Sequence, residues 1–113
     1  MPITKQDSLG EFEQLVLLAV LRLGEDAYGM RIREEIENRT GRSAAIGAVY
    51  ITLDRLIAKK YVSSFLGEAT PERGGRAKRF YQVEGAGMRA LQNSQLALTR
   101  MKEGLQHLLP EGI

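Results

Sequence analysis

The segment from Gly47 to Arg79 constrains the fold of this chain more than any other. It opens with an apolar-striped helical pattern, passes into a short apolar and aromatic run, crosses a polar loop, and ends in a second short run. Pro71, Gly74 and Gly75 exclude the loop from a central strand. The two short runs therefore predict a two-stranded β-hairpin directly after a helix.

The same spacing of apolar residues predicts two helices before this segment and one after it. We expect the first helix to begin at Ser8, where Ser8 and Glu11 form a capping-box pattern, and to end at Gly24. We expect the second helix over about 28–39, with Met30 on its buried side. The hairpin strands are expected in the two short runs, over 61–66 and 79–83.

The third helix is expected to begin between Ser43 and Gly47 and to continue to about Lys60. Its apolar stripe leaves another face exposed, and the first residues of that face, at the start of the helix, are small. A helix start of this kind allows a close approach to base edges or phosphates, because the free amides and the positive end of the helix dipole point the same way. The predicted exposed face contains Ala48, Thr52, Arg55 and Lys59.

The last helix is expected over 86–109, with Pro110 closing it. Its apolar residues alternate by three and four as in a heptad seam. At 1.5 Å per residue it would be about 33 Å long, longer than a compact three-helix core can cover. We therefore expect its far end to pack on a second chain, with folding back on the first helix as the alternative. The predicted dimer interface comprises Leu9, Phe12, Leu91, Leu98, Met101, Leu105 and Leu108.

The net charge of +2 is unevenly distributed along the chain. Residues 1–40 carry a net charge of −3, residues 41–79 carry +5, and residues 80–113 carry 0. The positive charge thus coincides with the third helix and the hairpin, where we expect it to form a single convex surface. Such a surface attracts nucleic acid, although a basic cluster is also compatible with simple solvation.

Composition excludes several classes of function. The chain has no cysteine, which excludes disulfides and agrees with a reducing, cytoplasmic location. No apolar run approaches the roughly 20 residues of a membrane span. His107 is the single histidine and has no partner at ligand spacing, so we expect no metal and no cofactor. Because no nucleophile, phosphate-binding glycine loop or catalytic carboxylate pair is present, we do not expect an enzyme.

These residues resemble the PadR family of transcriptional regulators, which are winged helix-turn-helix proteins that work as homodimers. The resemblance covers roughly residues 9–109, and in two places the chain departs from the commonest pattern. Ile51 stands where a proline often follows the helix tyrosine, and Lys60 stands where a glycine often precedes the hairpin. The matching residues are Tyr28-Gly29, Gly47-Ala48-Val49-Tyr50, Leu53, Arg55, Leu56, Tyr61-Val62, Gly75-Arg76, Tyr81, Gly87 and Leu91.

The resemblance implies an α+β, mainly α fold, with a winged helix DNA-binding domain over 1–85 and a C-terminal dimerisation helix over 86–113. It also implies a repressor that binds double-stranded DNA as a homodimer, at inverted half-sites roughly 34–36 Å apart. A winged-helix module that docks an acidic protein is the alternative. The resemblance leaves a small-molecule effector open, and Phe12 could line its site.

The residues expected to contact DNA come from the third helix and from the loop of the hairpin. For Arg55, pairing with the neighbours of Asp54 or with Glu34 and Glu35 is an equal alternative, and strand alternation could turn Arg79 away from the duplex. The predicted DNA-binding residues are Ser43, Ala48, Tyr50, Thr52, Arg55, Lys59, Arg73, Arg76 and Lys78.

Overall fold

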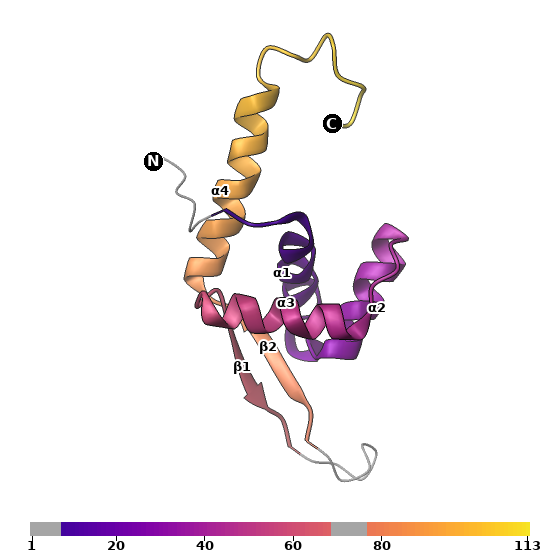
Figure 1. The fold of residues 1–113 in the computed structure, drawn as a ribbon, viewed down its shortest axis with the longest axis vertical. Helices are drawn as coiled ribbons and strands as arrows, with labels where there is room; N and C mark the ends of the chain where they lie inside the picture. The colour runs from indigo at the N-terminus through magenta and orange to yellow at the C-terminus, as the bar shows by residue number, and fades with distance from the viewer. Residues whose placement is uncertain (1–7, 69–76) are drawn as a thin grey trace.

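The computed structural model describes residues 8–68 and 77–113 (Figure 1). Within these residues the chain forms four α-helices, one short 3-10 helix and one two-stranded sheet, so the predicted α+β, mainly α class is confirmed. The elements are α1 (Glu11–Leu23), η2 (Gly24–Asp26), α2 (Gly29–Thr40), α3 (Ile46–Ala58), β1 (Val62–Leu66), β2 (Arg79–Val83) and α4 (Gly85–Lys102).

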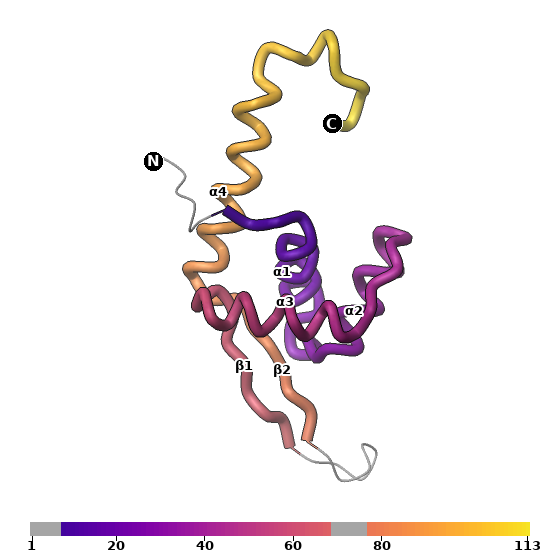
Figure 2. The backbone as a smooth tube through the Cα atoms, viewed as in Figure 1, coloured from indigo at the N-terminus to yellow at the C-terminus, as the bar shows by residue number. Residues whose placement is uncertain are grey.

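Helices α1, α2 and α3 pack against one another and form the body of the molecule. The hairpin leaves this body at one end of the long axis, and α4 leaves it toward the other end (Figure 1). The backbone trace shows both projections clearly, with the two strands side by side (Figure 2). The longest dimension is 57 Å. The fold therefore places the hairpin beside α3, and most of α4 lies away from the hairpin.

The core lies between the three helices of the body. Each helix contributes an apolar stripe at three- and four-residue spacing, as the sequence predicts. The large side chains with essentially no solvent exposure are Val16, Leu17, Ile32, Val49, Leu53 and Leu56.

The start of α1 differs from the prediction. The helix begins at Glu11, with Gly10 as its N-cap, so the expected start at Ser8 was wrong. The Glu13 carboxylate accepts a hydrogen bond from the Gly10 amide at 2.9 Å and another from Lys59 Nζ at 2.8 Å. With the helix beginning at Glu11, the Glu13 carboxylate can bind the Gly10 amide and the Lys59 ammonium together, and this favours a start after Gly10.

Glu13 is only 8% exposed, so its ionisation state matters for stability. Burial by itself raises the pKa of the carboxyl, but the hydrogen bonds from Lys59 and Gly10 and the charges of Lys59 and Arg55 outweigh it. The net pKa of Glu13 is therefore lowered. Stability from this carboxylate is complete above the unfolded-state pKa and is lost as the pH falls through the lower folded-state pKa.

Glutamine at position 13 tests this contact between α1 and the end of α3. We expect Glu13→Gln to lower the free energy of unfolding by about 1–2 kcal/mol at pH 7, because it removes a charged hydrogen bond. The difference from the unsubstituted protein should shrink as the pH falls through the folded-state pKa. Urea denaturation at several pH values measures both effects. Glu11→Gln is the matched control, because Glu11 is exposed and should change stability by no more than about 0.5 kcal/mol. Equal effects of the two substitutions would contradict the assignment.

Helix α2 begins after Tyr28 and ends at Thr40, and its C-cap Gly41 has a left-handed φ of 72°. Its buried residues are Gly29, Ile32 and Ile36. Met30 is exposed, so its expected place on the buried side was wrong. At the first turn the core contact is made by Gly29 instead.

Helix α3 ends at Ala58, and the chain then turns sharply into the hairpin. The Tyr61 amide donates a hydrogen bond to the Leu56 carbonyl at 2.9 Å, which requires a left-handed residue in the turn. Lys60 occupies that position with a φ of 65°. A side chain is disfavoured there, so glycine is the residue that fits this turn with the least strain.

Glycine at position 60 should therefore stabilise the protein. We expect Lys60→Gly to raise the free energy of unfolding by about 0.5–1 kcal/mol, since relief of the left-handed strain exceeds the extra entropy of the unfolded chain. Thermal denaturation measures the change. Lys60→Ala is the control, because it removes the ammonium group and keeps the strain. A gain of the same size for alanine would show that the charge, not the backbone, is responsible.

The predicted hairpin is confirmed. Strands β1 and β2 are antiparallel, with a register that runs from Val62 opposite Val83 to Leu66 opposite Arg79. The Tyr81 amide also donates a hydrogen bond to the Ala27 carbonyl at 2.9 Å. This bond attaches the hairpin to the segment just before α2, so the hairpin has a defined position relative to the body.

Helix α4 ends at Lys102, so its expected extension to residue 109 was wrong. Glu103 is extended, and Gly104 has a φ of 81°, which breaks the helix. Leu105 and Leu108 therefore lie beyond the helix, in a turn in which the Leu108 amide donates to the Leu105 carbonyl. The helix is about 27 Å long for its 18 residues. None of the helices in the described ranges is long and apolar enough to cross a membrane.

The first turns of α4 are held closely against the body. A side chain at Gly87 would lie 2.4 Å from the Tyr61 carbonyl oxygen, so only glycine allows this approach. Leu91 and Ser94 are buried on the same stripe of the helix. Leu98 and Met101 continue that stripe beyond the body, and Met101 is 76% exposed. The same helix face is thus buried at its start and uncovered at its end.

Candidate nucleic-acid interface

The rotation of α3 about its axis decides which side chains face solvent. Val49, Leu53 and Leu56 are completely buried, so the opposite side of the helix faces outward. We call this side the outward stripe. It consists of Gly47, Ile51, Asp54 and Ala58, which follow one another at intervals of four, three and four residues, and all four are exposed.

Thr52 does not lie on the outward stripe. It is 6% exposed and lies beside Val49 and Leu53 on the core side, so its predicted place on the exposed face was wrong. A threonine is polar enough to suggest exposure, but its small volume and methyl group are compatible with a core position. Ala48 is exposed, on the flank of the helix.

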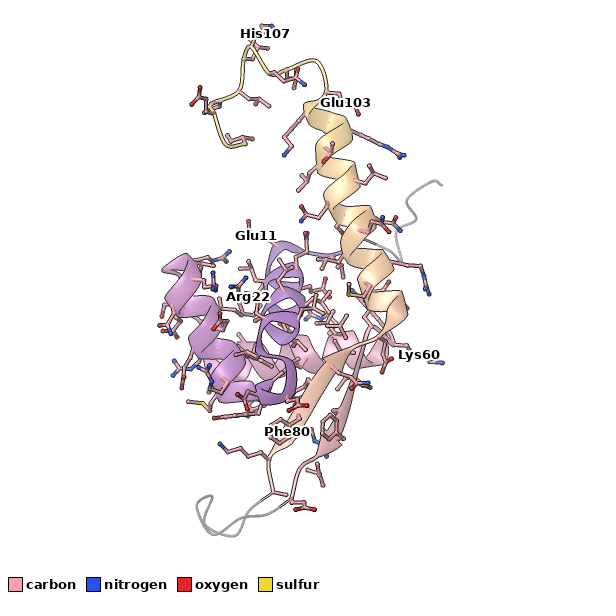
Figure 3. All side chains as sticks on the ribbon, turned by 180° about the vertical axis from the view of Figure 1, so that it is seen from behind. Glu11, Arg22, Lys60, Phe80, Glu103 and His107 are labelled. Atoms are coloured by element: carbon pink, nitrogen blue, oxygen red, sulfur yellow. The ribbon has the colours of Figure 1, made fainter. Side chains whose placement is uncertain are left out.

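Two of the cations expected at the interface are paired with the start of α1. Lys59 Nζ lies 2.8 Å from Glu13 Oε2, and Arg42 pairs with Glu11. The positive charge that these two residues add to the expected convex surface is therefore partly neutralised within the chain. Lys60 points away from the body at the far end of α3 (Figure 3).

Arg55 is exposed on the same flank of α3 as Ala48. It does not make the alternative pairing, because Glu34 pairs with Arg31, and Glu35 pairs with Arg22 and Arg39. The positive charge of Arg55 instead contributes to the lowered pKa of Glu13.

On the opposite flank, Tyr50 meets the start of α2. A side chain at Gly29 would lie 2.4 Å from Tyr50 Oη, so the glycine leaves room for the phenol ring. Tyr50 is nevertheless exposed. Lys78 Nζ lies 3.8 Å from the centroid of the Tyr28 ring. Together, α2, α3 and β2 form a hollow of about 410 Å³, lined by Tyr28, Gly29, Met30, Tyr50, Ala77, Lys78 and Arg79.

Aromatic contacts hold the loop end of the two strands against the segment before α2. Phe80 packs edge-on against Tyr28 at 5.7 Å between ring centroids and stacks on Phe65 at 5.8 Å. Burial raises the pKa of Tyr81, and the nearby Tyr50 and Asp54 add to the effect, so this phenol stays neutral. Arg79 Nη1 donates to Ser64 Oγ at 2.9 Å, which directs the guanidinium along the strands. Lys78, directly before β2, lies over the Tyr28 ring and lines the same hollow as Tyr50.

The structure thus brings together only part of the predicted DNA-binding set. Tyr50 and Lys78 border one hollow, whereas Thr52 is buried and Lys59 is paired. Ser43 is exposed in the connection between α2 and α3. Arg73 and Arg76 lie outside the described residues.

The exposed face predicted for α3 did not include Ile51 and Asp54, which the structure places on the outward stripe. The signal was available, because both residues fall opposite the stripe formed by Val49, Leu53 and Leu56 in a helical projection. An exposed isoleucine does not stand out in a hydrophobic helix, and a carboxylate does not suggest DNA.

The residues predicted for the dimer interface fall into two groups. Leu9 and Leu91 are buried in the core of their own chain, and Phe12 is half-buried against that core. The Leu9 amide also donates to Ser94 Oγ at 3.2 Å, which attaches the start of the chain to α4. The second group is exposed and comprises Leu98, Met101, Leu105 and Leu108.

No group of three potential metal-ligating side chains occurs among residues 8–68 and 77–113. His107 lies in the segment after α4, at the end of the molecule opposite the hairpin (Figure 3).

Comparison with known proteins places this geometry in context. The model of the transcriptional regulator PadR-like family matches residues 17–93. A protein of Lysinibacillus sphaericus is 28% identical over 106 residues, covering 92% of each chain. A PadR family transcription regulator from Clostridium difficile R20291 is similar in structure, with a TM-score of 0.68, 22% identity, and coverage of 89% of this chain and 100% of that one. The Aeropyrum pernix ORC1 protein, solved in complex with DNA, gives a TM-score of 0.61 at 19% identity over 84% of this chain and 27% of that one.

Proposed function

Because the chain belongs to the PadR-like family of transcriptional regulators, we propose that it is a repressor that binds DNA as a homodimer at an operator with inverted half-sites. The family is one of regulators, which agrees with the expectation that the chain is not an enzyme. The winged helix-turn-helix fold predicted from the sequence is also that of its structural relatives.

The outward stripe of α3 is the observation that carries this proposal. It is exposed along its whole length and begins with Gly47, so the helix can enter a major groove about 12 Å wide. Tyr50 and Lys78 lie on one flank, where they can contact the phosphates that border the groove. One solved structure of similar fold is a DNA complex, and this supports the same use of the fold.

Docking of an acidic protein, the alternative function, has less support. Asp54 places a carboxylate in the middle of the outward stripe, where it would repel the acidic side chains of such a partner. The same carboxylate can accept hydrogen bonds from base amino groups in a major groove.

The uncovered part of α4 supports the homodimer. Leu98 and Met101 continue a stripe that the body buries further back, and a second copy of the chain would cover them in the same way. In such a dimer the α4 helices would set the distance between the two α3 helices, which should match half-sites about 34–36 Å apart. Occupation of a promoter by this dimer would exclude the polymerase and cause repression.

The salt dependence of binding tests the role of the hairpin in DNA contact. We expect Arg76→Ala combined with Lys78→Ala to reduce the slope of log K against log salt by up to about 1.8, which is about 0.9 for each lost phosphate contact. Fluorescence anisotropy with the promoter region of the protein's own gene, between 50 and 200 mM salt as a rough range, measures the slope. Lys102→Ala, at the end of α4, should leave it unchanged. An unaltered slope in the double variant would mean that the hairpin does not touch DNA.

A charged residue at position 101 tests the dimer. We expect Met101→Glu to convert the dimer to a monomer, because it places a charge where the second copy should bury an apolar side chain. Analytical ultracentrifugation measures the mass, and circular dichroism verifies the fold. The control is Leu96→Glu, an apolar-to-charged change on the opposite face of α4, which should leave the dimer intact. A Met101→Glu protein that remains dimeric would exclude this face from the interface.

A further inference from the structure

Ile51 is the large apolar side chain of the outward stripe of α3. It is 60% exposed, while Val49, Leu53 and Leu56 of the same helix are completely buried. A β-branched side chain also has a lower helix propensity than alanine or a straight-chain polar residue. At this position isoleucine therefore adds nothing to the core and little to the helix, and its apolar surface is available for a contact outside the chain.

The surroundings of Ile51 restrict what it can contact. Gly47 precedes it by one turn, and a side chain there would meet nothing within 4 Å. Ala48, three residues before Ile51, is also small and exposed, so the surface on the N-terminal side of Ile51 is low. The helix backbone can therefore approach a base edge closely while the Ile51 side chain projects toward the base.

Asp54 limits the possible occupants further. It lies three residues after Ile51 on the outward stripe and is exposed. A carboxylate is repelled by phosphate but accepts hydrogen bonds from the amino groups of adenine and cytosine in the major groove. The chemistry of the stripe is thus suited to base edges, and the groups suited to phosphate, Tyr50 and Lys78, lie on its flank.

An isoleucine side chain cannot form hydrogen bonds, so it can distinguish bases only by apolar contact. The C5-methyl group of thymine is the apolar group that the four bases present in the major groove. We infer that Ile51 selects thymine in the operator through contact with this methyl group. The inference rests on the proposed DNA-binding function and identifies the base that this position of α3 recognises.

Deoxyuridine provides a direct test, because it pairs as thymine does and lacks only the methyl group. Preferred duplexes are first selected from a random library with the unsubstituted protein. Each thymine of a selected duplex is then replaced by deoxyuridine in turn, and Kd is measured by fluorescence anisotropy at constant salt. We expect about a threefold to fourfold loss of affinity at one thymine in each half-site, the effect of one buried methyl group.

Variants then assign the effect to Ile51. In Ile51→Ala the ratio of the two Kd values, thymine against deoxyuridine, should fall to about 1, while in Ile51→Val most of the ratio should remain. Leu21→Ala removes an exposed apolar side chain from α1 and should keep the full ratio. Because Ile51 is exposed, its substitution should leave the fold intact, which circular dichroism verifies.

The outcomes separate this inference from the proposed function. If the unsubstituted protein prefers particular duplexes but no thymine shows the effect, or if Ile51→Ala keeps the full ratio, the inference is overturned and the proposed function stands. If the unsubstituted protein shows no preference over random duplex, the proposed function fails and the inference fails with it.

Discussion

Burial of the apolar stripe of α3 is the constraint on which the rest of the structure depends. Val49, Leu53 and Leu56 are completely buried, and each contributes roughly 1.5–3 kcal/mol relative to exposure. Rotation of the helix by one residue would move this stripe by about 100° and lose most of that energy. The stripe therefore determines the rotation of α3, and the rotation determines that Ile51 and Asp54 face outward.

Electrostatics then divides the surface around α3. The acidic start of α1 neutralises Lys59 and Arg42 on one flank. On the other flank, the contacts of Phe80 with Tyr28 orient the hairpin and place Lys78 near the start of α2. In the proposed DNA complex, attraction to phosphate would therefore come from the hairpin side, while the outward stripe meets the bases. Affinity and base selection would thus depend on different groups.

The close contact of Gly87 with the Tyr61 carbonyl connects this surface to α4. Tyr61 directly precedes β1, so the helix, the hairpin and the end of α3 meet at one place. Movement of α4 in a dimer would accordingly move the hairpin and α3 together. In the proposed function, this rigid connection converts the geometry of the dimer into a defined spacing of the two recognition helices.

The order of the elements, the buried stripe of α3 and the two strands could be predicted from the sequence, because apolar periodicity and glycine positions act over one or two helical turns. The end of α4 could not be predicted, because the apolar spacing of the helix continues past its break at Gly104. The burial of Thr52 could not be predicted either, because it depends on the core residues that surround this side chain. The sequence alone thus determined which elements form and which faces are apolar. Only the tertiary structure decided which charges remain free, since Lys59 and Glu13 lie 46 residues apart and meet only when α1 packs against α3.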